Sequence, residues 1–188
     1  MIGIYDTTTG QFKRVTTAEG QALAGEAEYP DVPLDISETH YVNVVPQNPV
    51  LIPFPPRPTD FHFWDWSQHA WLPDVEAARE FARTRIDANT AQTISDGANV
   101  NGNIYHAEDS FLIDVQAMIV GLENGDIPPP VSIIRKDNQI EEFTLEPLRG
   151  LFLAIHEYRR IARILGRNEK DAVNQATTIA DVVSHIPP

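Results

Sequence analysis

Five side chains that could take part in chemistry lie within nine residues of the chain: His106, Glu108, Asp109, Ser110 and Asp114. An imidazole together with carboxylate oxygens could hold a divalent cation, and a serine near a histidine could act as a nucleophile. The same residues could instead form the polar start of a buried helix. The choice between these interpretations decides whether the sequence indicates an enzyme or a protein that works by contact.

The residues that follow favour the helix. Apolar side chains recur at i, i+1, i+4, i+7, i+8 and i+11, which is one face of a helix: Phe111, Leu112, Val115, Met118, Ile119 and Leu122. Asp109 or Ser110 stands in the N-cap position, acidic residues suit the first turn, and Gly125 suits the end. Asp114 would point away from Asp109 on this helix, and no oxyanion element accompanies Ser110. The metal and nucleophile hypotheses are therefore the weaker ones.

Other catalytic motifs are missing from the sequence. No two of the six histidines have the spacing of a metal site, and "AIHEYRR" has Arg160 where a zinc-protease helix needs its second histidine. There is no Walker loop, dinucleotide-binding turn or nucleophile elbow. The absence of cysteine excludes disulfides, thiolate zinc sites and cysteine nucleophiles. We therefore expect a non-enzymatic protein with no catalytic residue, no metal and no cofactor.

The composition limits the partners. A net charge of −13, spread over the whole length, disfavours nucleic acid and anionic membranes and favours solubility or a basic protein surface. No apolar run approaches the roughly 18 residues of a membrane span, and no signal peptide is visible. A chain without cysteine suits a reducing cytoplasm.

The N-terminal part is predicted to be β structure followed by a stiff spacer. Residues 2–15 predict a hairpin around the turn Asp6–Gly10, residues 17–38 show no clear pattern, and residues 39–46 predict a strand. Residues 46–58 hold six prolines in thirteen positions, which favours a polyproline II connector over a sheet. A ligand for an aromatic groove is the less favoured interpretation of this segment.

An aromatic hairpin follows at residues 61–73, "FHFWDWSQHAWLP". The spacing repeats that of the first hairpin. In both segments an aromatic residue is followed directly by Asp, and a second aromatic residue lies seven positions after the first aromatic residue. Aromatic side chains would then face each other across each ladder. Three tryptophans within eight residues fit a packed hairpin or a protein contact, and a sugar platform is the alternative.

Helical periodicity begins after Asp74, a candidate N-cap. The first helix should bury Val75, Ala78, Ala82, Ile86 and Asn89, and turn signals after residue 96 predict a short hairpin. A second hairpin is predicted within residues 131–143. A long helix capped by Thr144 and ended by Gly166 should bury Leu148, Leu151, Phe152, Ile155, Ala162 and Leu165, and Asn168 can cap a last helix. The predicted fold is α+β, with residues 1–45 as a β region, 46–60 as a Pro-rich linker, and 61–188 as a domain of about four helices with two short hairpins.

The order of these elements resembles a family of tailed-bacteriophage and prophage proteins that is catalogued as a domain of unknown function. Its members often occur among tail-fibre, baseplate and fibre-assembly proteins. The matching segments are "FHFWDWSQHAWLP", "VEAAREFARTRIDA", "GNIYHAEDSFLIDVQAMI", "VSIIRKDNQIEEFTLEPL" and "LFLAIHEYRRIARI", which span about residues 60–166. Gly102, Asp109 and Ser110 match the most characteristic part. Family members often have a tryptophan before the second hairpin, where this chain has "PPPVSII". The resemblance brings no catalytic residues.

The resemblance implies a structural component of a phage tail, at the baseplate or the tail-fibre junction. Such a protein would be made in the host cytoplasm and be retained in the virion tail. Its partners would be other tail or fibre proteins, and a homo-oligomer is expected, with a trimer suggested only by how fibres are built. The candidate contact residues are Trp64, Trp66, Trp71, Phe54, Pro55 and Pro56. The alternatives are a fibre-assembly chaperone that leaves before the virion matures and a sugar-binding module at the tryptophans.

Overall fold

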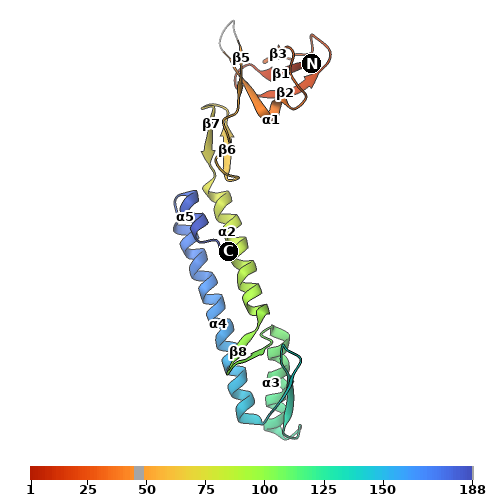
Figure 1. Cartoon of the computed structure of the whole chain (residues 1–188), viewed down its shortest axis with the longest axis vertical. Coiled ribbons are helices and arrows are strands. Elements are labelled where there is room, and N and C mark those ends of the chain that lie inside the picture. The colour runs from red at the N-terminus through yellow and green to blue at the C-terminus, as the bar shows by residue number, and fades with distance from the viewer. Residues whose placement is uncertain (45–48, 188) are drawn as a thin grey trace. The chain divides into compact units, whose positions relative to one another are not determined.

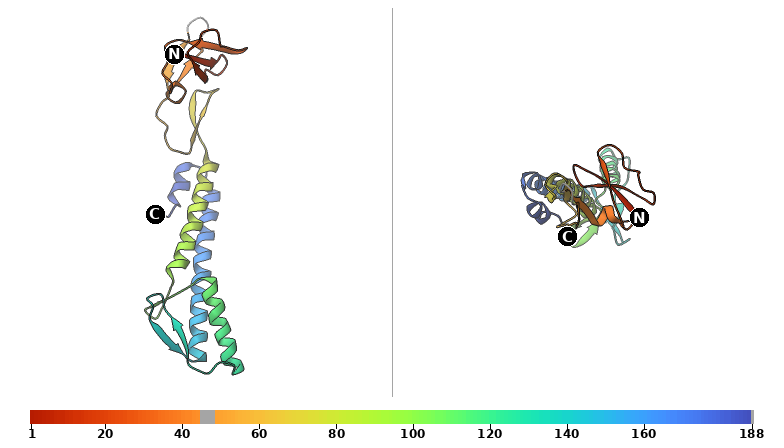
Figure 2. Two further views of the ribbon diagram at one scale, coloured as in Figure 1. Left: turned by 90° about the vertical axis from the view of Figure 1, so that its right-hand side faces the viewer. Right: turned by 90° about the horizontal axis from the view of Figure 1, so that it is seen from above.

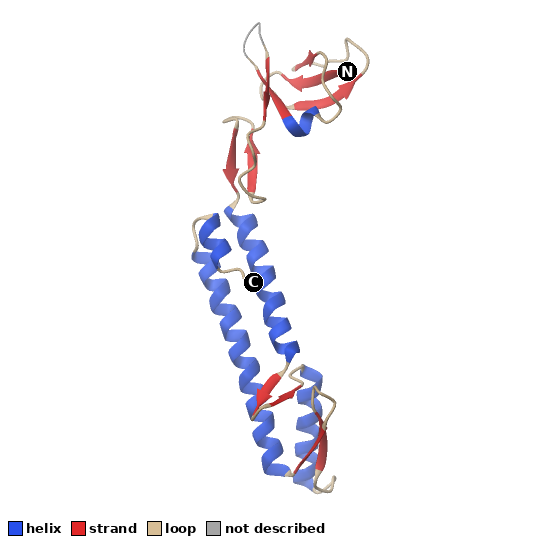
Figure 3. Cartoon of the chain, viewed as in Figure 1, coloured by secondary structure: helices blue, strands red, loops and turns tan. Residues whose placement is uncertain are grey.

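The chain has a mixed α+β fold in a computed structural model that describes residues 1–44 and 49–187. It divides into two compact units, Met1–Asp74 and Val75–Pro188. The first unit is built from small antiparallel sheets, and the second is mostly helical with two hairpins (Figures 1 and 3). This confirms the α+β class that the sequence predicts.

The first unit begins with the predicted hairpin. Strands β1 (Ile2–Asp6) and β2 (Phe12–Thr16) pair antiparallel, and β3 (Glu26–Tyr29) pairs with the other edge of β1. The sequence had not predicted β3. The buried core of this unit is formed by Tyr5, Phe12, Val32, Ile36 and Val42.

A short helix and a second hairpin complete this core. Helix α1 (Ile36–Thr39) leads into β4 (His40–Asn43), which pairs with β5 (Val50–Pro53). The predicted linker, residues 46–60, is therefore wrong over Val50–Pro53, which form a strand. Pro53 is tolerated because it ends an edge strand and leaves the ladder intact. Residues 45–48, which include the predicted strand end and linker start at Pro46, lie outside the described residues.

The aromatic hairpin belongs to the first unit. Strands β6 (His62–Asp65) and β7 (Ala70–Pro73) pair with Trp64 opposite Trp71, as the spacing predicted. The compact units divide after Asp74, whereas the predicted boundary lay before residue 61. Contacts that spacing does not reveal join this hairpin to the rest of the unit: His69 Nε2 lies 3.1 Å from the Thr9 carbonyl oxygen, and the ring of Tyr41 packs on those of Trp64 and His69.

Two long helices and a short one form one part of the second unit. Helix α2 (Val75–Asp96) lies along α4 (Leu145–Gln175), and α5 (Ile179–Ser184) packs against α2 (Figure 2). Gly166 of α4 lies where α2 comes close, since a Cβ there would be only 2.3 Å from Thr90 Oγ1. The missing side chain therefore lets the two helices approach.

Helix α3 (Asp109–Asn124) packs beside the other part of α4, next to two hairpins. These are β8 (Ala98–Val100) with β9 (Asn103–Tyr105), and β10 (Val131–Ile134) with β11 (Ile140–Phe143). The predicted stripe of α3 enters the core through Leu112, Val115 and Ile119. Tyr105 ties the hairpins together, because its hydroxyl donates to Glu141 Oε2 at 2.5 Å.

Several helix details differ from the predictions. Gly166 does not end the long helix, which continues to Gln175 because this glycine fits against α2. Asn168 therefore lies inside α4, and Thr178 caps α5 by accepting a hydrogen bond from the Asp181 amide. Leu165 and Asn89, which were predicted to be buried, are exposed, whereas Val173 and Val182 are buried. Thr144 does precede α4, but its side chain makes no capping hydrogen bond.

Candidate functional site

The turn of the aromatic hairpin is held by Asp65. Its Oδ1 accepts hydrogen bonds from the amides of Ser67 at 2.7 Å and Gln68 at 2.9 Å, and from the Ser67 hydroxyl. These bonds, led by the Ser67 hydroxyl, hold the pKa of Asp65 below its usual value. An aspartate that bonds the backbone two and three residues ahead fixes a tight turn.

The first hairpin contains the same turn. Asp6 Oδ1 accepts from the amides of Thr8 and Thr9, both at 2.9 Å, and these bonds lower the pKa of Asp6. Gly10 has φ 74° and His69 has φ 50°, so the equivalent residue of both turns is left-handed. Tyr5 pairs with Phe12 as Trp64 pairs with Trp71. The repeat that the spacing predicted is therefore present in the structure.

The tryptophans of the second hairpin form a cluster with residues from β4 and from the segment after β5. We call this group the aromatic cluster: Tyr41, Phe54, Trp64, Trp66, His69 and Trp71. Trp64 lies at its centre, with ring centroids 4.7 Å from Phe54 and 5.3 Å from both Tyr41 and Trp71. The three tryptophans are half-buried.

Four ring pairs of the cluster meet edge to face, and these pairs involve Phe54 and the three tryptophans. Trp64 crosses Trp71 at 75° and Trp66 at 77°. Such pairs are a favoured packing of aromatic rings. A sugar platform needs rings that share one open plane, so this geometry supports a protein contact more than a glycan contact.

The Pro-rich segment supports the cluster through its backbone. Trp71 Nε1 donates to the Pro55 carbonyl oxygen at 2.8 Å, and the Arg57 guanidinium lies 5.7 Å from the centre of the Trp71 ring. Pro55 and Pro56 are exposed. Of the six predicted contact residues, the structure brings Phe54, Pro55 and the three tryptophans together.

Sequence reasoning missed Tyr41, His69 and Arg57. A signal for His69 was present, because it follows Asp65 by the same number of residues as Gly10 follows Asp6. That equivalence points to a left-handed residue in a turn. The stacking of its ring on Tyr41, at 4.7 Å and 29°, depends on tertiary packing and has no signal in the spacing.

The segment that suggested chemistry forms a structural ion pair. Helix α3 begins at Asp109 and its N-cap is Glu108, so the prediction that Asp109 or Ser110 caps the helix is wrong. The Asp109 carboxylate instead bonds the guanidinium of Arg159 on α4, which lowers the pKa of Asp109. Arg159 is buried. A buried charge without a partner is strongly destabilising, so the carboxylate of Asp109 stabilises the fold by pairing with it.

The remaining residues of that segment do not converge on one point. His106 Nδ1 lies 3.5 Å from Glu108 Oε2, and Ser110 and Asp114 are exposed positions of α3. Within residues 1–44 and 49–187, no three histidine or acidic side chains are arranged to hold a metal ion. No helix in the same residues is long and apolar enough to cross a membrane.

Comparison of the chain with protein-family models, with curated proteins and with solved structures found no match. A functional interpretation therefore rests on the geometry of the chain and on the motifs described above.

Proposed function

We propose that this protein is a structural component of a bacteriophage tail, at the baseplate or the tail-fibre junction, and that it acts through protein–protein contacts. The observation that carries the proposal is the aromatic cluster. Six aromatic side chains from the β4–β5 hairpin, the β6–β7 hairpin and the segment between them pack together. All of them except Tyr41 remain partly accessible to solvent.

Half-exposed aromatic side chains that are held in place by their neighbours suit a binding surface. Aromatic residues dominate the energy of protein interfaces, and rigid ones lose little entropy on binding. Trp66 touches Phe54 and Trp64 at the edge of the cluster. These side chains offer apolar area to a partner without further folding.

The resemblance to tail-associated phage proteins supplies the kind of partner. The segments that carry it are the aromatic hairpin, the charged helix α2, the β8–β9 hairpin with α3, the β10–β11 hairpin and α4. In this account Asp109 serves by fastening α3 to α4, and the chain has no catalytic role. The partners would be tail or fibre proteins, and the location would be the virion tail.

The test is the composition of purified particles. Quantitative mass spectrometry of virions of the phage that encodes this chain should find it at a fixed ratio to a known tail protein. Its absence from virions, together with its presence on fibres in infected cells, would contradict the structural role and support a fibre-assembly chaperone.

A further inference from the structure

Helix α4 carries a basic face that its own core does not use. The helix holds six of the chain's fourteen Lys and Arg residues. Six side chains recur at helical spacing on one side, away from the buried stripe, and we call them the α4 face: Leu153, His156, Arg160, Arg163, Ile164 and Arg167. All are exposed, with Leu153 at 66 % and Ile164 at 41 %. The α4 face is therefore available to a partner.

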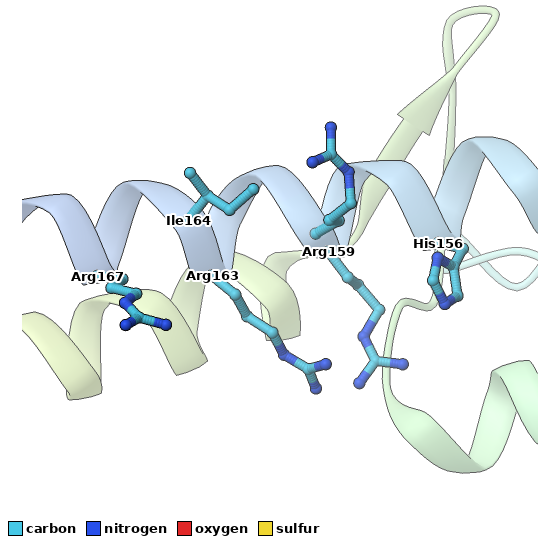
Figure 4. Close-up of a pocket in the computed structure, with 6 residues that line it drawn as sticks. His156, Arg159, Arg163, Ile164 and Arg167 are labelled. Atoms are coloured by element: carbon cyan, nitrogen blue, oxygen red, sulfur yellow. The ribbon is translucent and has the colours of Figure 1, made fainter.

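A hollow of about 290 Å³ lies along the α4 face (Figure 4), and Arg159 lines it together with residues of this face. Arg160 of this face pairs with the carboxylate of Glu157 at 2.6 Å. Arg163 is 3.9 Å from Asp109, and Arg167 has no ion pair within the described residues. In Figure 4 the side chains of Arg163 and Arg167 point to one side of α4 and that of Ile164 points to the other. The α4 face thus offers both positive charge and apolar area, which favours a partner that brings carboxylates and apolar side chains together.

Helix α3 carries a surface of the opposite kind. Ile113, Ala117 and Val120 recur on its outer side, and Ile113 is 64 % and Val120 46 % exposed. A hollow of about 460 Å³ lies over them and is bordered by Asp126. We use the name α3 face for the following residues: Ile113, Asp114, Ala117, Val120 and Asp126. No Lys or Arg occurs between Arg85 and Arg135, so this surface is acidic.

These two faces cannot meet within one chain. The stripe of Leu112, Val115 and Ile119 already packs α3 toward α4, so the α3 face points to the other side. Each face therefore lacks what the other provides. The acidic carboxylates Asp114 and Asp126 have no ion pair in the described part of the chain, and Arg167 has none either.

We propose that the partner of the α4 face is a second copy of this chain, which docks with its α3 face. The contact joins two different surfaces, so it repeats from copy to copy and closes into a ring or extends as a filament. Apolar side chains form the centre of the contact and opposite charges form its rim. The proposal does not depend on the role in a phage tail, since it uses only Val75–Pro188.

The test exchanges the charges of each face. One variant carries Arg163→Glu with Arg167→Glu, and the other carries Asp114→Lys with Asp126→Lys. Sedimentation should show the natural chain as an assembly larger than its 21.0 kDa mass. Each variant alone should weaken association by about tenfold or more, because like charges then meet at the rim. An equal mixture of the two should associate again, because each variant then meets a face of opposite charge.

Controls separate this contact from general effects of charge and folding. Arg85→Glu changes an exposed arginine of α2, outside both faces, and should leave association unchanged. Ile164→Ser and Ile113→Ser should each weaken association, whereas Ile140→Ser, at a 68 % exposed position of β11, should not. Circular dichroism checks that every variant is folded. A monomeric natural chain, an effect of only one charge variant, or a mixture that stays dissociated would each overturn the proposal.

Discussion

The β1–β2 and β6–β7 hairpins contain the same type of turn, but the turns have different surroundings. In both, an aspartate accepts amide hydrogen bonds two and three residues ahead, and the residue four positions after it is left-handed. The first hairpin gains a third strand and a buried core. The second remains two-stranded, and its aromatic rings pack on β4 and on Phe54. The same local chemistry thus builds a core in one place and a half-exposed cluster in the other.

The left-handed position shows why the two turns are not interchangeable. At Gly10 a Cβ would lie 1.9 Å from the Val42 carbonyl oxygen, because β4 is bonded directly to this turn. At His69 a side chain is tolerated, and its imidazole stacks on Tyr41. The turn at Gly10 leaves no room for a side chain because β4 packs against it. The turn at His69 contacts the same strand through its imidazole, which stacks on Tyr41.

The largest effect is expected from Gly10→Ala. The substitution combines a left-handed backbone with overlap against a carbonyl group, and we expect it to lower the stability of the first unit by about 4 kcal/mol. All three tryptophans lie in Met1–Asp74, so denaturation followed by tryptophan fluorescence reports on this unit. A loss similar to that of Gly20→Ala, where no atom lies within 4 Å of the added Cβ, would contradict the explanation.

Trp64→Ala should have the next largest effect. It removes the ring at the centre of the aromatic cluster, and the expected cost is about 2–3 kcal/mol, below that of a fully buried tryptophan. The matched variant is Trp66→Ala at the edge of the cluster, which should cost about 1 kcal/mol. Equal losses from the two variants would show that Trp64 is not the central ring.

His69→Gly should be milder than either. The glycine keeps the left-handed turn and loses the stacking on Tyr41 and the contact with Thr9, so we expect a cost of about 1 kcal/mol. Thermal unfolding followed by fluorescence measures it. A loss of stability as large as that of Gly10→Ala would show that the two turn positions are equivalent.

Acid should weaken both turns slightly. Amide and hydroxyl hydrogen bonds hold the pKa values of Asp6 and Asp65 below that of the unfolded chain. The stabilisation is therefore complete above the unfolded pKa, near 4, and is lost as the pH falls through the lower folded value. Asp65→Asn keeps an oxygen acceptor that does not titrate, so it should flatten the fall in melting temperature below about pH 4. An unchanged acid slope in Asp6→Asn with Asp65→Asn would contradict the assignment.

Local patterns predicted the elements well, and tertiary contacts decided what the patterns missed. The turn chemistry of Asp6 and Asp65 and the stripe of α3 depend on neighbours in sequence, so both were predictable. Gly166 was predicted to end the helix, because glycine is common at helix ends. Its actual role is to let α4 approach Thr90 on α2, and this contact is distant in the sequence. The aromatic cluster was predicted only in part, since the contribution of Tyr41 comes from a strand paired with the Pro-rich segment.

We expect the aromatic cluster to be a contact surface in the assembled particle. This expectation is tested most directly by replacing Trp66 with the photo-crosslinking residue p-benzoyl-phenylalanine and irradiating purified virions. The matched control places the same residue at Leu23, which is 67 % exposed in the same unit. We expect a crosslink from position 66 to a neighbouring tail or fibre protein and none from position 23. A silent position 66 in particles that contain the chain would contradict it.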